Sequence, residues 1–185
     1  MLFTPTSLPG VIVFEPKVFP DERGFFFESY NQRLFNDNNI SNVFVQDNQS
    51  FSSYGVIRGL HYQRQPYAQS KLVRVILGKI LDVVVDMRAG SPTFGKSFGI
   101  ELSAENKMQL FIPRGFAHGF SVLSETAELA YKCDQFYNKQ SESGIRYNDP
   151  LLNIDWQIPP DKAVISTKDA QLPEFNAAIA DFIYQ

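Results

Sequence analysis

A basic cluster surrounds one of the two histidines in this chain of 185 residues. Arg58 and His61 lie in the run VIRGLHYQ, and Lys71 and Arg74 follow in KLVRV. Both runs are otherwise apolar and predict buried strands, in which cations cost desolvation energy unless an anion meets them. A titratable histidine beside fixed positive charge suits proton removal from a carbon acid that carries an anionic group. The alternative is a structural ion-pair cluster at a strand end, which is commoner in an arbitrary chain.

The second histidine, His118, ends the turn PRGFAH (113–118). A Pro-x-Gly-x-x-His turn is similar to the second motif of the cupin barrels, where the histidine usually binds a metal. Metal-binding cupins place two histidines at positions i and i+2 of the first motif and add a glutamate. Here those positions are His61 and Gln63, and Lys71 follows instead of a carboxylate. Because this is a poor ligand set for a divalent cation, the sequence predicts a metal-free site. A metal-dependent cupin oxygenase remains an alternative.

Three further residues are candidates for proton transfer or binding. Asp169 could pair with His61 and orient its ring, or it could be an exposed turn carboxylate. Tyr131 lies in an apolar run, where a tyrosine is more often core than catalytic. An ordinary tyrosine pKa of about 10 suits proton donation to an enolate rather than proton removal. Tyr137 is most simply an aromatic residue of a loop.

The elements that position these residues are predicted to be strands. From Val56 to Leu129 we expect seven or eight short strands separated by turns, at the spacing of a barrel or sandwich. No helix-length amphipathic pattern interrupts them, which disfavours a βαβ fold. Outside this region we expect strands at 11–14 and 43–50, a turn and an aromatic strand within 21–30, one or two helical turns within 31–39, an extended piece at 165–169, and a C-terminal helix over 173–184.

Composition limits the class of protein. The chain is 44% hydrophobic and 20% charged, which is typical of a soluble globular domain. Its 17 basic and 20 acidic residues give a net charge of −3, without a basic run that predicts nucleic-acid or membrane binding. The single cysteine, Cys133, excludes an internal disulfide, fits a reducing cytosol and is expected to pack in a strand. We find no signal peptide or membrane span and therefore expect a cytoplasmic protein.

Several segments together resemble the dTDP-4-dehydrorhamnose 3,5-epimerase family, the metal-free cupins of dTDP-L-rhamnose synthesis. The resemblance runs roughly from Leu8 to Asp169. It is carried by FEPKVFPDERGFFFESYN (14–31), FVQDNQS (44–50), VIRGLHYQ (56–63), KLVRV (71–75), DMRAGSPTFG (86–95), LSAENK (102–107), FIPRGFAHGF (111–120), LAYKC (129–133) and STKDA (166–170). It implies one all-β domain over 1–185, a cupin-type jelly-roll barrel with a short C-terminal helical segment. Strands within about 1–50 would contribute to a homodimer, and 161–185 would form a C-terminal extension.

The resemblance also implies roles for individual residues. His61 would be the catalytic base with Asp169 as its partner, and Lys71 would stabilise an enolate oxygen. Tyr131 would be the general acid on the opposite face of the sugar. The remaining positions would bind substrate: Arg58 at the diphosphate, His118 near the sugar, Gln46 and Asn48 at the nucleotide, Arg23 and Glu28 from the neighbouring protomer, and Tyr137, Glu142 and Lys168 within the pocket.

The implied reaction is epimerisation of dTDP-4-dehydro-6-deoxy-alpha-D-glucose to dTDP-4-dehydro-beta-L-rhamnose, for lipopolysaccharide or cell-wall polysaccharide. Both the C3 and the C5 proton lie alpha to the C4 ketone, so one base, one cation and one acid can serve both carbons. No cofactor is implied, in agreement with the lack of a GxGxxG motif. Two alternatives remain: an epimerase of one carbon only, and a sugar-nucleotide-binding cupin without catalysis.

Overall fold

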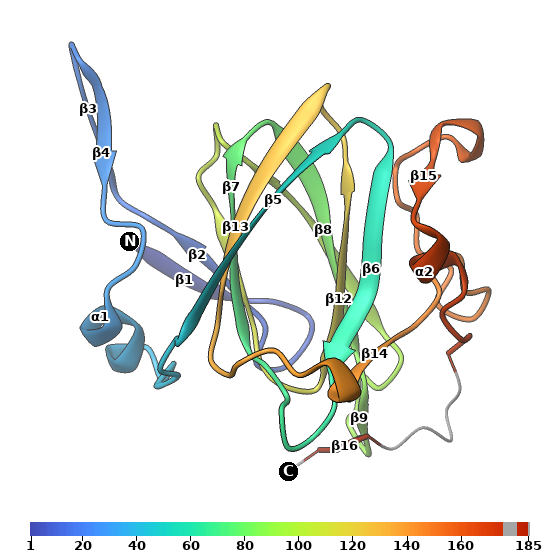
Figure 1. The fold of residues 1–185 in the computed structure, drawn as a ribbon. Coiled ribbons are helices and arrows are strands. Elements are labelled where there is room, and N and C mark those ends of the chain that lie inside the picture. Colours follow the sequence, from blue (N-terminus) through green and yellow to red (C-terminus); the bar gives the residue numbers. More distant parts are fainter. Residues whose placement is uncertain (176–180, 185) are drawn as a thin grey trace.

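Two facing β-sheets form an open-ended barrel, with short helices at its periphery (Figure 1). The computed structural model describes residues 1–175 and 181–184. The first sheet has the order β1 (Leu2–Pro5), β2 (Ile12–Glu15), β11 (Gln109–Ile112), β7 (Lys71–Leu77), β13 (Thr126–Cys133), β5 (Gln46–Ser53). The second has the order β10 (Ser97–Ser103), β8 (Lys79–Asp86), β12 (Phe116–Val122), β6 (Val56–Gln63), β14 (Glu142–Gly144), and β15 (Val164–Ile165) also pairs with β6.

The smaller elements lie outside this barrel. β3 (Val18–Asp21) and β4 (Gly24–Phe27) form a hairpin that extends away from it (Figure 1). β9 (Arg88–Ala89) pairs with β16 (Phe182–Ile183) near the C terminus. The helices are α1 (Gln32–Asp37), α2 (Thr167–Ala170) and two 3₁₀ turns, Lys139–Ser141 and Pro160–Lys162. No helix among the described residues is long and apolar enough to cross a membrane.

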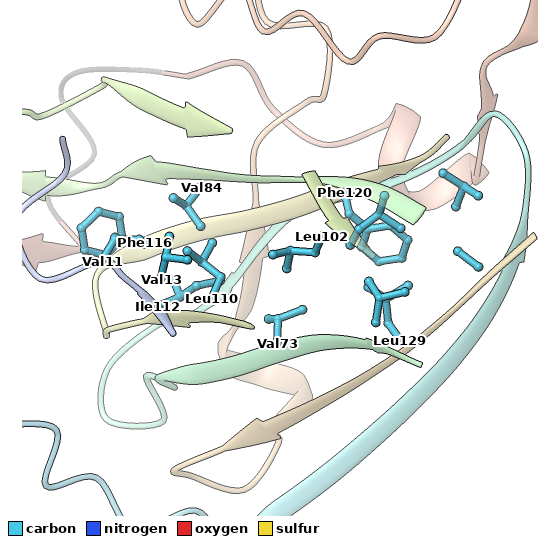
Figure 2. Packing of buried hydrophobic residues seen from close by; sticks show 14 of the residues in the cluster. Val11, Val13, Val73, Val84, Leu102, Leu110, Ile112, Phe116, Phe120 and Leu129 are labelled. Atoms are coloured by element: carbon cyan, nitrogen blue, oxygen red, sulfur yellow. The ribbon is translucent and has the colours of Figure 1, made fainter. Parts of the chain in front are cut away.

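The predicted all-β jelly-roll fold is confirmed, including eight strands from β6 to β13. Strand alternation builds its core: Val73 and Val75 point into the barrel, whereas Leu72, which precedes Val73, packs in a separate cluster outside it. Figure 2 shows the barrel cluster, in which Val73 and Leu129 from one sheet approach Phe120 from the other. This packed cluster gives rigid support to the polar side chains of the barrel interior.

The chain differs from the sequence prediction near its C terminus. The short helical segment is α2, and it begins within the piece predicted to be extended because the Ser166 hydroxyl accepts from the Asp169 N–H and caps it. The helix predicted over 173–184 is wrong for its described residues: 173–175 form no helix, and Phe182–Ile183 form β16. Phe182 fills a core position and stacks edge-on against Tyr62, a tertiary contact that outweighs a weak helical pattern. Residues 176–180 lie outside the described residues.

Two expected boundaries also move at the N-terminal side. The strand predicted over 43–50 begins at Gln46, and the helical turns predicted within 31–39 form α1. Asn31 caps that helix, because its side-chain oxygen accepts from the N–H groups of Arg33 and Leu34. Helix α1 lies outside the barrel, on the side of the β3–β4 hairpin (Figure 1).

Candidate active site

A cavity of about 510 Å³ opens inside the barrel and borders the apolar core at Phe120 and Leu129. Seven of the predicted site residues line it: Arg58, His61, Lys71, His118, Tyr131, Lys168 and Asp169. A second cavity of about 280 Å³ shares His61, Lys71 and Tyr131 with the first. Four more predicted residues line this second cavity: Gln46, Asn48, Tyr137 and Glu142. The two hollows therefore meet at the three residues predicted to carry the chemistry.

His61 and Asp169 form a hydrogen-bonded pair at one side of the cavity. The His61 Nε2 atom lies 2.8 Å from Asp169 Oδ1, and the other carboxylate oxygen accepts from the Gly59 N–H at 3.2 Å. Asp169 is only 4% exposed, so the alternative of an exposed turn carboxylate is wrong. Since the carboxylate accepts from Nε2, the neutral ring keeps its lone pair on Nδ1, where it can take a proton.

The position of Asp169 also fixes its charge. Burial raises the pKa of its carboxyl group, but hydrogen bonds from His61, Gly59 and Ser166 outweigh burial and bring the pKa below the ordinary value of 3.8. Asp169 is therefore a carboxylate at neutral pH. A fixed negative charge at this place orients the His61 ring.

Lys71 and Tyr131 lie on the facing sheet. They come from the neighbouring strands β7 and β13, and the Lys71 Nζ atom is 5.9 Å from the centre of the Tyr131 ring. Burial raises the pKa of the Tyr131 phenol, which keeps it protonated and suited to proton donation. Burial lowers the pKa of the Lys71 ammonium group, so an anion that forms beside it would be strongly favoured.

The second histidine has a carboxylate partner that the sequence analysis missed. His118 Nε2 lies 2.7 Å from Oδ1 of Asp82, which is completely buried in β8. The register of β12 and β6 places His118 directly across from His61. A carboxylate in the middle of an apolar strand is the signal that could have revealed Asp82, because a buried charge needs a partner. Among residues 1–175 and 181–184, no three His, Cys, Asp or Glu side chains form a cluster suited to a metal ion.

Three predicted binding residues are joined across the mouth of the cavities. The Tyr137 hydroxyl donates to Glu142 at 2.9 Å, and Lys168 Nζ lies 2.5 Å from the other oxygen of that carboxylate. Burial raises the pKa of Glu142, but the hydrogen bonds from Lys168 and Tyr137 outweigh it and lower the pKa. Tyr137 lies in a loop, as predicted, and is 52% exposed.

The cationic and amide side chains at the cavity wall have simpler surroundings. Arg58 Nε donates to the Ser52 hydroxyl at 3.1 Å, and this arginine is exposed. Gln46 Nε2 donates to Asn48 Oδ1 at 3.0 Å. These groups can present a guanidinium and amides to a ligand without a large rearrangement.

Arg23 and Glu28 are the two predicted site residues that one chain does not bring to the cavity. Arg23 lies at the tip of the β3–β4 hairpin and Glu28 just beyond β4, and neither lines either cavity. Arg23 pairs with Asp21 at 2.6 Å, and its side chain is 82% exposed. The hairpin that carries it points away from the barrel (Figure 1).

A jelly roll with a histidine–carboxylate pair facing a lysine and a protonated tyrosine has the groups that an isomerase of the proton-transfer type requires. The family model described as dTDP-4-dehydrorhamnose 3,5-epimerase matches residues 5–177. The chain belongs to this family of isomerases, as the sequence predicted.

Individual relatives cover nearly the whole chain. The dTDP-4-dehydrorhamnose 3,5-epimerase of Shigella flexneri is 56% identical over 171 residues, which are 92% of this chain and 93% of that protein. The Pseudomonas aeruginosa protein of the same name is 56% identical over 179 residues, 96% of this chain and 98% of that protein. The fold is similar to the crystal structure of dTDP-6-deoxy-D-glucose-3,5-epimerase from Legionella pneumophila in complex with dTDP-4-keto-L-rhamnose. That comparison has a TM-score of 0.95 and 47% identity and covers 100% of this chain and 98% of that one.

Proposed function

We propose that this protein inverts C3 and C5 of dTDP-4-dehydro-6-deoxy-alpha-D-glucose and forms dTDP-4-dehydro-beta-L-rhamnose for dTDP-L-rhamnose synthesis. The observation that carries the proposal is the placement of base and acid on opposite sheets. His61 and Asp169 lie at one wall of the cavity, and Lys71 and Tyr131 come from the facing sheet. Inversion at carbon requires proton removal on one face and proton delivery on the other, and this arrangement meets that requirement.

The first half of each inversion is proton removal. His61 Nδ1 takes the proton from C3 or C5, and the electron pair of the broken C–H bond moves toward the C4 carbonyl oxygen. Asp169 stabilises the imidazolium that forms, and Lys71 donates a charge-assisted hydrogen bond to the enolate oxygen. The enolate anion offsets the cost of keeping a buried ammonium group, so stabilisation grows as the charge develops.

The second half is proton delivery. The Tyr131 phenol gives its proton to the same carbon from the opposite face, the C4 ketone re-forms, and the carbon is inverted. The resulting phenolate and imidazolium return to their starting states by proton exchange with water. No electron is lost or gained, so the reaction needs no nicotinamide, and Lys71 supplies the positive charge at the enolate oxygen.

Substrate binding is assigned to the charged and polar rim. We assign the diphosphate to Arg58, since a guanidinium binds phosphate oxygens in a bidentate way. His118 is assigned to the sugar, and Gln46 and Asn48 to the nucleotide. Tyr137, Glu142 and Lys168 close the remaining side.

We also propose a homodimer in which the β3–β4 hairpin reaches the partner's cavity. Phe25 and Phe26 of this hairpin are 59% and 69% exposed, a large apolar surface for an isolated chain. Such a contact would bring the partner subunit's Arg23 and Glu28 toward the nucleotide. The lone buried Cys133 is in keeping with a location in the reducing cytoplasm.

The proposal is tested by incubating the protein with dTDP-4-dehydro-6-deoxy-alpha-D-glucose and determining the product's configuration by NMR. The expected product has both C3 and C5 inverted. A product inverted at one carbon would identify a single epimerase, and binding without conversion would identify a non-catalytic sugar-nucleotide-binding protein. Either result would contradict the proposed function.

A further inference from the structure

The loop that follows β13 is held over the second cavity by glutamine side chains. Gln46 Oε1 accepts from the Tyr137 N–H at 3.0 Å, and Gln63 Oε1 accepts from the Asn138 N–H at 3.0 Å. Two consecutive backbone amides of one loop are therefore fixed by two strands of the barrel, β5 and β6. Both glutamines line the cavity that also contains Tyr137.

A third glutamine holds the beginning of the same loop. Gln69 Nε2 donates to the Gln135 carbonyl at 2.7 Å, and Gln69 lines the same cavity. The loop is thus tied to the barrel on both sides of its exposed aromatic residue. Loops with this many side-chain anchors lose little entropy when a ligand binds to them.

Gln63 is the most deeply buried of the anchors, at 6% exposure. The register of β6 and β14 also places it directly opposite Glu142, which receives the Tyr137 hydroxyl bond. Gln63 therefore stands between the two points that fix Tyr137: the adjacent backbone at Asn138 and the carboxylate at Glu142. If the side-chain oxygen of Gln63 were removed, the Asn138 N–H would lose its hydrogen-bond partner and the loop would loosen.

This geometry explains why a glutamine, Gln63, stands two positions after His61. Metal-binding cupins have a second histidine here, which points a ring nitrogen at the metal. In this chain the position carries an amide whose oxygen reaches the loop instead. Gln63 thus anchors the loop after β13 and is not merely a substitution for a metal ligand.

We propose that Gln63 is a positioning residue that acts through Tyr137: it holds the aromatic ring where a planar base can stack on it. The ring's hydroxyl is fixed by Glu142, and the half-exposed side chain lines the second cavity, where a nucleobase can reach it. The inference rests on the proposed function, because the base is that of the dTDP group. It assigns Gln63 to nucleotide affinity and not to proton transfer.

The test uses Gln63→Met, which keeps the side-chain length and removes the acceptor. We expect the Kd for dTDP, measured by titration calorimetry, to rise about tenfold, and the KM for the sugar nucleotide to rise with it. The kcat at saturation should change by less than about twofold, since the proton-transfer groups are untouched. Gln140→Met is the matched control: this exposed glutamine lies near the same loop but outside the cavity, and its substitution should leave Kd unchanged.

A double-mutant cycle separates positioning from a general structural effect. In a Tyr137→Ala background, Gln63→Met should change the Kd by less than about twofold, because the ring that it positions is absent. If Gln63→Met does not fold, Gln63→Asn, whose amide is too short to reach Asn138, replaces it. Additive effects, or a lower kcat with unchanged Kd, would overturn the inference. Because dTDP binding is measured without turnover, a wild-type protein that binds dTDP but converts no sugar refutes the proposed function alone.

Discussion

His61 Nε2 lies 2.8 Å from Asp169 Oδ1, although 108 positions separate the two residues in the chain. The pairing depends on β15, which runs parallel to β6 and carries the chain into α2 beside His61. A terminal segment of the chain thereby completes the site of a central strand. The orientation of the proposed base is therefore a property of the whole fold.

Asp169→Asn should lower kcat about 10²–10³-fold, because the amide cannot stabilise a charged imidazolium. The Kd for dTDP should stay within about twofold of wild type, since the nucleotide is assigned to other residues. Steady-state kinetics and calorimetry measure both quantities. Asp161→Asn is the control, as this exposed carboxylate pairs only with the adjacent Lys162. Near-normal kcat in Asp169→Asn would show that the pair is structural.

Tyr131→Phe should separate proton removal from proton delivery. The base remains intact, so exchange of substrate protons with solvent should continue, while formation of the inverted product falls about 10²-fold, chiefly at C5. NMR in deuterium oxide follows exchange and product together. Tyr54→Phe, at an exposed position outside both cavities, should behave as wild type. Equal loss of exchange and inversion would contradict the assignment of Tyr131 as the acid.

Lys71 should determine the alkaline side of the pH profile. Burial lowers its pKa below the ordinary 10.5, so the enolate-stabilising charge is lost at a lower pH than for an exposed lysine. The kcat/KM should therefore fall with an apparent pKa below 10.5, whereas burial raises the pKa of the Tyr131 phenol above that of an ordinary tyrosine. Lys71→Met should lower kcat about 10²–10³-fold at neutral pH. An alkaline fall of kcat/KM with an apparent pKa at or above 10.5 would contradict this assignment.

Mixing two inactive variants tests the proposed dimer. Arg23→Ala and His61→Ala protomers, unfolded and refolded together, should regain about a quarter of the wild-type sites if Arg23 acts on the partner's cavity. Gel filtration with light scattering gives the oligomeric state. His61→Ala mixed with Tyr131→Phe is the control, because both residues line one chain's cavity and no intact site can form. Recovery in the control, or its absence in the test mixture, would contradict the proposed arrangement.

Asp86 should make folding stability depend on pH in the acid range. Burial raises its pKa, but bonds from Arg88, Ser91 and Thr93 outweigh burial and bring it below 3.8. A lowered carboxyl pKa stabilises the fold above about pH 4, and this stability is lost as the pH falls through the folded-state pKa. Asp86→Asn should therefore cost about 3 kcal/mol in urea unfolding at neutral pH and much less near pH 2. An equal cost at both pH values would contradict the linkage.

Local chemistry explains which features could be predicted from the sequence. Strand alternation indicated that Leu129 and Tyr131 share a face, and both line the cavity. The Pro-Gly turn before His118 indicated its return into the barrel. By contrast, the contact of Asp169 with His61 depends on a parallel pairing that no local pattern encodes. The prediction of a C-terminal helix was wrong at Phe182, because burial against Tyr62 decides the conformation of this residue.

The hydrogen-bond partners of buried polar side chains could not be predicted from the sequence either. Asp82 and Gln63 act through single hydrogen bonds to groups 36 and 75 positions away, His118 and Asn138. Their residue types signalled that partners were needed, but only the strand order identifies those partners. The resemblance to a known family, rather than periodicity, supplied the roles of Arg23 and Glu28.

Deuterium exchange into the substrate tests the central claim most directly. Wild-type protein and dTDP-4-dehydro-6-deoxy-alpha-D-glucose are incubated in deuterium oxide, and the sugar is examined by NMR. We predict deuterium at both C3 and C5 with the wild-type protein, and at neither carbon with His61→Ala, while the Kd of that variant for dTDP stays within about twofold. Exchange at the wild-type rate in His61→Ala, at either carbon, would contradict the account.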